Sequence, residues 1–165
     1  MQLDRFKDAH MYYAEGSKIK KASSYCHWGM GYAKITNNKH ILFNKLQKKI
    51  SAKIKAECQK RYLAAIEHFK LAVNNFDKKT SNIVNVLKMY TLSKSEYHAL
   101  PYGGKAFTLN RVELSLADAY YSSNQYILAK QLYNRLFEQN PTDKGLALRI
   151  GGILNKLGKT KEARQ

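Results

Sequence analysis

The fold is decided by the stretch LADAYYSSNQYILAKQLYNRLFEQNP, residues 116–141. Two small residues, Ala117 and Ala129, lie in segments of helical spacing, and a tyrosine follows each of them within one turn. A small side chain lets two helices approach closely, while a bulky neighbour fills the space beside the crossing. The stretch therefore predicts a packed helical hairpin that ends at Pro141, because proline cannot continue a helix.

The same residue types recur 34 positions further along the chain. Asn124 and Gly158 occupy one pair of equivalent positions, and both residue types tolerate the left-handed backbone that reverses a chain after a helix. Five equivalent positions keep compatible chemistry, which predicts two helical hairpins in register. The five pairs are Leu116 and Ile150, Ala117 and Gly151, Tyr120 and Leu154, Asn124 and Gly158, and Ala129 and Ala163.

This pattern resembles the tetratricopeptide repeat, a 34-residue helical hairpin with W-x2-L-G-x2-Y, then A-x3-F, then a closing proline. Glu113 stands where that family has tryptophan, which is a departure from the pattern. The resemblance implies an all-α fold, a right-handed superhelix of antiparallel helix hairpins with about seven to eight helices. The positions that fit are Leu116, Ala117, Tyr120, Ala129, Tyr133 and Pro141.

The resemblance weakens toward the N-terminus. It is good over residues 107–165, moderate over residues 46–76, where Ala65-x3-Phe69-x2-Ala72 resembles a second helix, and poor before residue 40. We expect one all-helical domain over residues 1–165. Within it we expect N-terminal helices over 1–40, a degenerate repeat with a long amphipathic helix over 41–100, and repeats over 101–165, the last one incomplete.

The strongest hydrophobic periodicity of the chain lies in residues 40–76. Apolar residues follow one another there at steps of three or four, which places them on one face of a helix. An unbroken helix would be a rod of roughly 55 Å, and a break near Ser51 or Lys60 is the alternative. The apolar positions are Phe43, Leu46, Ile50, Ile54, Cys58, Tyr62, Ala65, Phe69, Ala72 and Phe76, and the basic face beside them carries Lys45, Lys48, Lys49, Lys53, Lys55 and Lys60.

Local signals predict further helix ends. Residues 2–36 are expected to form two helices with a break at residues 15–17, Glu-Gly-Ser, and an end at residues 36–38, Thr-Asn-Asn. One of Asp77, Thr80 and Ser81 is expected to cap a helix that contains Ile83, Val84, Leu87 and Tyr90.

Residue patterns typical of catalysis or cofactor binding are not found in the sequence. The two cysteines and five histidines match no metal-site spacing, and the acidic residues are scattered singly. Gly29-x-Gly31 and Gly151-Gly152 follow no predicted strand, so they are interpreted as helix-packing glycines rather than a nucleotide loop. We therefore expect no enzyme activity, no cofactor, no metal and no small-molecule substrate.

The charge favours an acidic partner. The chain has 29 lysines and arginines against 12 acidic residues, a net charge of +17, which attracts acidic proteins or polyanions. No apolar signal-peptide core follows Met1, and nowhere do 18 apolar residues run together, so we expect a cytoplasmic protein without a membrane span.

The resemblance implies a concave groove lined by the first helix of each hairpin. Such a groove would bind an extended acidic or carboxylate-terminated peptide, or would assemble the chain into a larger complex with another protein. The alternative is RNA or DNA binding through the basic face, because six lysines on one side of a helix could neutralise phosphates. The expected groove residues are Arg111, Asp118, Tyr121, Arg149, Asn155 and Lys156, with Leu114, Ser122 and Leu148 beside them.

Overall fold

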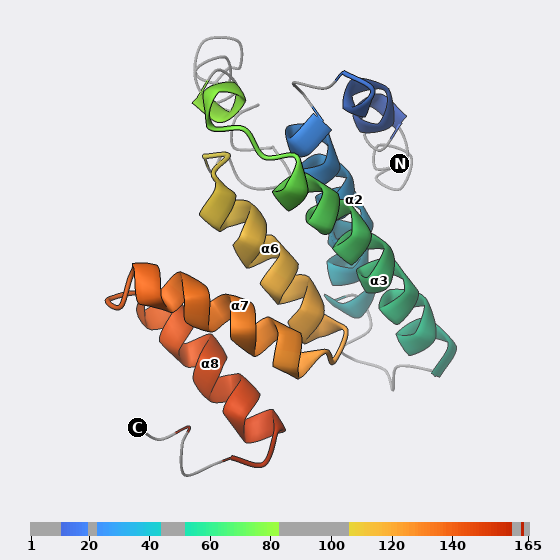
Figure 1. Ribbon diagram of the computed structural model, residues 1–165. Helices are drawn as coiled ribbons and strands as arrows, with labels where there is room; N and C mark the ends of the chain where they lie inside the picture. The colour runs from blue at the N-terminus through green and yellow to red at the C-terminus, as the bar shows by residue number, and fades with distance from the viewer. Residues whose placement is uncertain (1–10, 20–22, 44–51, 83–105, 160–162, 164–165) are drawn as a thin grey trace.

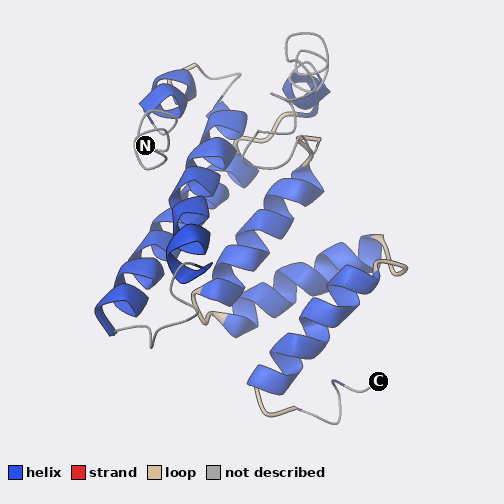
Figure 2. Ribbon diagram, turned by 180° about the vertical axis from the view of Figure 1, so that it is seen from behind, coloured by secondary structure: helices blue, strands red, loops and turns tan. Residues whose placement is uncertain are grey.

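The computed structural model describes residues 11–19, 23–43, 52–82, 106–159 and 163, with side chains given throughout except at 36–43. Every regular element in these ranges is a helix, so the all-α prediction is confirmed (Figures 1 and 2). Short helical segments cover residues 11–17 and 78–82. The longer helices are α2 (Ser23–Phe43), α3 (Ala52–Asn74), α6 (Leu109–Ser122), α7 (Tyr126–Gln139) and α8 (Lys144–Lys156).

The helices pack in chain order, each against the next. The contacts join α2 to α3, α3 to α6, α6 to α7 and α7 to α8, and successive helices run in opposite directions (Figure 1). Contacts between neighbours along the chain build up a row of helices rather than a bundle around one central axis. Within the described residues, each helix is either too short or too polar to cross a lipid bilayer.

Of the two possibilities left open for residues 40–76, one unbroken helix or two helices, the structure has two helices. Helix α2 ends at Phe43, and α3 begins at Ala52 and packs back along α2. The alternative break near Ser51 agrees with these bounds, whereas Lys60 lies inside α3. The apolar face of α3 is buried in this arrangement, which a single exposed rod could not achieve. Residues 44–51 lie outside the described part of the chain.

Helix α2 also runs past its expected end. Residues 36–38, Thr-Asn-Asn, lie inside it, so the prediction that the helix ends there is wrong. Asparagine and threonine each lower helix stability by roughly 0.7 kcal/mol or less, and packing on α3 offsets a penalty of that size. The break expected at residues 15–17 falls just after them: these residues form the last turn of the first helical segment, the N–H of Ile19 donates to Gly16 O at 3.1 Å where that segment ends, and α2 begins at Ser23.

The aromatic core lies where α2 meets α3 and α6. Trp28 of α2 is fully buried, and its ring centroid lies 5.3 Å from those of both Tyr32 and Phe107. Phe69 of α3 is also fully buried and lies edge-on to Tyr32 at 5.7 Å. The apolar face of α3 meets this cluster, and its buried residues are Cys58, Ala65, Ile66, Phe69 and Ala72.

Two glycines let other elements approach α2 closely. A Cβ atom on Gly31 would lie 2.4–2.8 Å from the Phe69 ring, and one on Gly29 would lie 2.6–2.7 Å from the Tyr13 ring. Both separations are far below a normal carbon–carbon contact. The interpretation of these residues as helix-packing glycines is confirmed.

The hairpin α6–α7 has the predicted small residues at its centre. Ala117 and Ala129 are fully buried, with Tyr120 and Tyr133 buried beside them. Asn124, between α6 and α7, has φ 63°, and Gly158, which follows α8, has φ 77°, so both take the left-handed backbone expected at these equivalent positions.

The equivalent positions further along the chain are described in α8 and at Ala163. Gly151 is half-buried, and a Cβ there would lie 3.5 Å from Ala163 O, an ordinary contact. Gly152 has open space at that position, so its interpretation as a packing glycine finds no support in the described residues.

Helix starts follow the local sequence. The N–H of Arg111 lies 3.3 Å from the Thr108 hydroxyl at the start of α6, and Asp143 accepts from the N–H groups of Gly145 and Leu146 at the start of α8. Asp77 accepts from the Thr80 N–H at 2.7 Å, which identifies it as the capping residue of the segment 78–82. The expected continuation through Ile83, Val84, Leu87 and Tyr90 lies outside the described residues.

Candidate binding surface

A single carboxylate joins three helices on one side of the row. Asp118 Oδ1 on α6 accepts a hydrogen bond from the Tyr133 hydroxyl on α7 at 2.5 Å and from Arg149 Nε on α8 at 3.1 Å. Burial and the neighbouring Asp118 carboxylate raise the pKa of Tyr133, so its hydroxyl stays protonated and donates. Two expected groove residues, Asp118 and Arg149, are thus brought into contact although 31 residues separate them.

A second set of contacts joins α2 to α6. Trp28 Nε1 donates to the Ser115 hydroxyl at 3.0 Å, and the Ser115 and Tyr32 hydroxyls lie 3.1 Å apart. Burial raises the pKa of Tyr32, so its phenol remains neutral beside the serine. The helices α2, α6 and α8 are therefore linked by side chains, although each is separated from the next by another helix along the chain. We call the side of α6 and α8 that carries Asp118, Arg149 and Lys156 the first-helix face.

The remaining expected groove residues are more scattered along the same helices. Arg111 is half-buried on the first turn of α6, and it is one of the charges near the Tyr32 hydroxyl. Tyr121 packs edge-on against Tyr126 with 5.6 Å between ring centroids. Asn155 and Lys156 are exposed at the end of α8. Only Asp118 and Arg149 form a direct contact.

The predicted basic face is described only in part. Lys53, Lys55 and Lys60 are exposed on α3, and none of them forms an ion pair within the described residues. Lys53 and Lys60 are seven positions apart and share a side of the helix, whereas Lys55 lies about 200° around from Lys53. Lys45, Lys48 and Lys49 lie outside the described residues.

Reasoning from sequence missed the partner of Glu113. This residue is buried, and its Oε1 lies 2.7 Å from Nη2 of Arg135, whose side chain is half-exposed. The ion pair ties α6 to α7 at the position where the tetratricopeptide pattern has tryptophan. The sequence did offer one signal, a charged residue at a position of the pattern that is normally buried. Its partner could not be predicted, because Arg135 lies 22 positions away on another helix.

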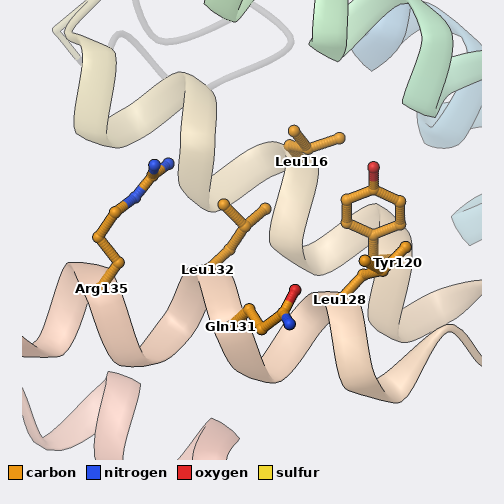
Figure 3. Close-up of a pocket in the computed structure, with 6 residues that line it drawn as sticks. All are labelled: Leu116, Tyr120, Leu128, Gln131, Leu132 and Arg135. Carbon is orange, nitrogen blue, oxygen red and sulfur yellow. The ribbon is translucent and has the colours of Figure 1, made fainter.

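A hollow opens on another side of the α6–α7 hairpin (Figure 3). Its volume is about 380 Å³. Leu116 and Tyr120 of α6 face residues of α7 across it, and sequence reasoning did not anticipate it. The residues that line it are Leu116, Tyr120, Leu128, Gln131, Leu132 and Arg135.

The described residues contain no group of three or more histidine, cysteine, aspartate or glutamate side chains that could hold a metal ion. Burial raises the pKa of Cys26 and lowers that of the neighbouring His27, which favours the neutral form of both. What this part of the chain offers chemically is hydrogen-bonding and charged surface.

Comparison of the chain with protein-family models, curated proteins and solved structures finds no match.

Proposed function

We propose that the chain is a non-catalytic interaction scaffold with tetratricopeptide-like architecture, and that its first-helix face binds an extended acidic peptide segment of another protein. The hairpins α2–α3 and α6–α7 and the helix α8 would then be successive units of a right-handed superhelix. The packing of each helix on the next in chain order supports this arrangement.

The observation that carries the proposal is the contact between Asp118 on α6 and Arg149 on α8. It links α6 to α8, which would be the first helices of two successive hairpins, while a buried contact between Trp28 and Ser115 links α2 to α6. A continuous surface made of first helices is what a helical repeat presents to an extended ligand.

The charge of this surface favours carboxylates. Arg149 uses Nε on Asp118 and Nη1 on the Gly145 carbonyl, and its side chain is 43% exposed. Lys156 is exposed further along α8, next to the amide of Asn155. An extended peptide can meet these groups through charge-assisted hydrogen bonds while the net charge of +17 speeds its approach.

The test compares two charge-reversal variants that have equal net charge. Arg149→Glu with Lys156→Glu changes the first-helix face, and Lys53→Glu with Lys60→Glu changes α3. Binding of a fluorescein-labelled, glutamate-rich 12-residue peptide is measured by anisotropy, with circular dichroism confirming helicity. We expect the first variant to weaken binding about tenfold or more, because close charged contacts contribute more than the general field. Equal weakening in both variants would contradict a site on α8.

Nucleic-acid binding is the alternative, supported by Lys53 and Lys60, which are exposed and form no ion pair with any residue that the structure describes. A mixed-sequence oligonucleotide measured at 50 and 200 mM salt separates the two functions. Binding that falls steeply with salt and is lost in the Lys53→Glu, Lys60→Glu variant, while the peptide does not bind, would favour nucleic acid. We expect the peptide to be the better ligand.

A further inference from the structure

The hollow between α6 and α7 is lined by aligned leucines with an arginine at one end. Leu128, Leu132 and Arg135 follow one another along α7 at steps of four and three residues, which aligns them on one face. They span roughly 10 Å at 1.5 Å per residue. Leu116 and Tyr120, one turn apart on α6, form the opposite side, and Figure 3 shows Arg135 at one end and Tyr120 at the other.

Helix α3 meets α6 near the Tyr120 end of the hollow. Gln59 donates from its side-chain amide to Ser123 O at 2.9 Å, so its side of α3 meets the end of α6. Leu63 lies one turn further along the same side of α3 and is 46% exposed. The groove itself has leucines along its length and the basic side chain of Arg135 at one end.

The groove is separate from the first-helix face. Asp118 lies two positions from both Leu116 and Tyr120, which is about 200° around α6. Its carboxylate meets Tyr133 and Arg149, whereas Leu116 and Tyr120 line the groove. A ligand in the groove would therefore leave the first-helix face free.

We propose that this groove binds an amphipathic helix of an acidic partner protein, an interaction beyond the peptide binding proposed above. Two apolar side chains one turn apart on the partner pack on Leu116, Tyr120, Leu128 and Leu132. A carboxylate one turn further along meets Arg135.

Charge decides in favour of an acidic partner rather than a second copy of this chain. Two copies with +17 each repel one another, whereas an acidic helix is attracted to the same field. Arg135 keeps donors for a ligand while its Nη2 pairs with Glu113, because a guanidinium carries five N–H groups and its side chain is 51% exposed. Seven residues of groove length match two turns of helix.

The experiment uses a phage-displayed library of 14-residue helical peptides, varied at apolar and charged positions and selected against the whole chain. Leu128→Glu and Gln131→Glu place a carboxylate in the groove at exposed positions. Ile127→Glu is the matched control, since it adds the same charge to the same helix at a residue that is 67% exposed and does not line the groove. Circular dichroism checks that all three variants keep their helicity.

We expect the selected peptides to combine leucine-like residues one turn apart with aspartate or glutamate on the next turn. Leu128→Glu and Gln131→Glu should weaken binding of the selected peptides at least tenfold, whereas Ile127→Glu should weaken it less than threefold. The Arg149→Glu, Lys156→Glu variant should bind them normally, so the failure of either proposal is visible separately. Failure to select such peptides, or equal loss in the Ile127→Glu control, overturns the proposal. Self-association in sedimentation that Leu128→Glu abolishes would also overturn it, because the occupant would then be a second copy.

Discussion

Gly31 shows at the scale of one residue how closely α2 and α3 approach. Replacing it by alanine should lower the free energy of unfolding by about 1–3 kcal/mol, because the added carbon meets the buried Phe69 ring at 2.4–2.8 Å. Gly152→Ala is the control, since open space surrounds that position of α8. Alanine should raise stability there by up to about 1 kcal/mol through its helix propensity. Urea unfolding of both variants checks the sign of each change. An unchanged free energy of unfolding in Gly31→Ala would contradict the close contact between Gly31 and the Phe69 ring.

His27 makes the stability of the α2–α3 contact depend on pH. Its ring stacks on that of His68, with 5.8 Å between centroids, and burial lowers the pKa of His27 from its ordinary value of 6.5. The unfolded chain therefore takes up this proton more readily than the folded one. Stability is fully present above about pH 6.5 and is lost as the pH falls toward the lower pKa of the folded state.

We expect the urea midpoint to fall between pH 7 and pH 5, and His27→Phe to reduce that fall while keeping a ring at this position. The contribution of one proton cannot exceed about 1.4 kcal/mol per pH unit. An identical pH profile in the variant would assign the effect to other groups.

Single residues differ in how far they could be predicted. Ala117, Ala129, Asn124 and Gly158 were predictable because their roles depend on side-chain size or backbone freedom at fixed spacing. The role of Ser115 was not, because it depends on Trp28, 87 residues away in the chain.

At the scale of helices and turns, Asn124 after α6 and Gly158 after α8 share the same left-handed geometry. Gly158→Ala should lower the free energy of unfolding by about 1–2 kcal/mol, since a β-carbon disfavours that geometry. Asn124→Ala should also lower it, because alanine lacks the side-chain amide that lets asparagine tolerate this geometry and that accepts from the Tyr126 hydroxyl at 2.7 Å. Asn124→Gly should cost less than Asn124→Ala. Thermal unfolding compares the three variants, and equal effects of alanine and glycine at position 124 would show that backbone geometry is not the cause.

The ion pair between Glu113 and Arg135 couples α6 to α7. Arg135→Ala leaves a buried carboxylate without its partner and should cost about 1–3 kcal/mol, less than for a fully buried pair because Arg135 is half-exposed. Replacing both residues by leucine should cost less than Arg135→Ala alone. A double-mutant cycle measured by urea unfolding gives the coupling energy between the two residues. If the effects of the two single substitutions simply add, the two residues are not coupled and the prediction is wrong.

Helix type was easier to predict than helix ends. The apolar steps over residues 40–76 identified the buried face of α3, but the same period continues toward α2, and a pattern of period 3.6 does not record a reversal of direction. The Thr-Asn-Asn stretch at 36–38 gave a false end because intrinsic propensity is small beside packing.

At the scale of the whole molecule, Asp118 ties the last described helix to the row. Asp118→Ala removes two hydrogen bonds that hold α7 and α8 to α6. Their combined contribution of about 1–2 kcal/mol should speed amide hydrogen exchange in α8 roughly five- to thirtyfold, with α2 and α3 little changed. Glu67→Ala, which removes an exposed pair on α3, is the control. Uniform acceleration across all helices would indicate global destabilisation instead.

For the first-helix face, the helices that form it could be predicted from the sequence, but only some of the contacts between its side chains could. Counting from the small residues identified Asp118 and Arg149, which do meet. The groove lined by Leu116 and Leu128 escaped notice because apolar residues at helical spacing indicate burial, and exposure at the edge of a packed pair depends on the neighbouring helices.

The matching backbone turns at Asn124 and Gly158 have one more consequence. Because both residues take a positive φ and stand 34 positions apart, a duplicated block of that length inserted between α7 and α8 would carry the residue that its own turn needs. Each new copy would contact only the copies before and after it. Evolution or an engineer could thus extend the protein by gene duplication, one unit at a time, without redesigning the rest.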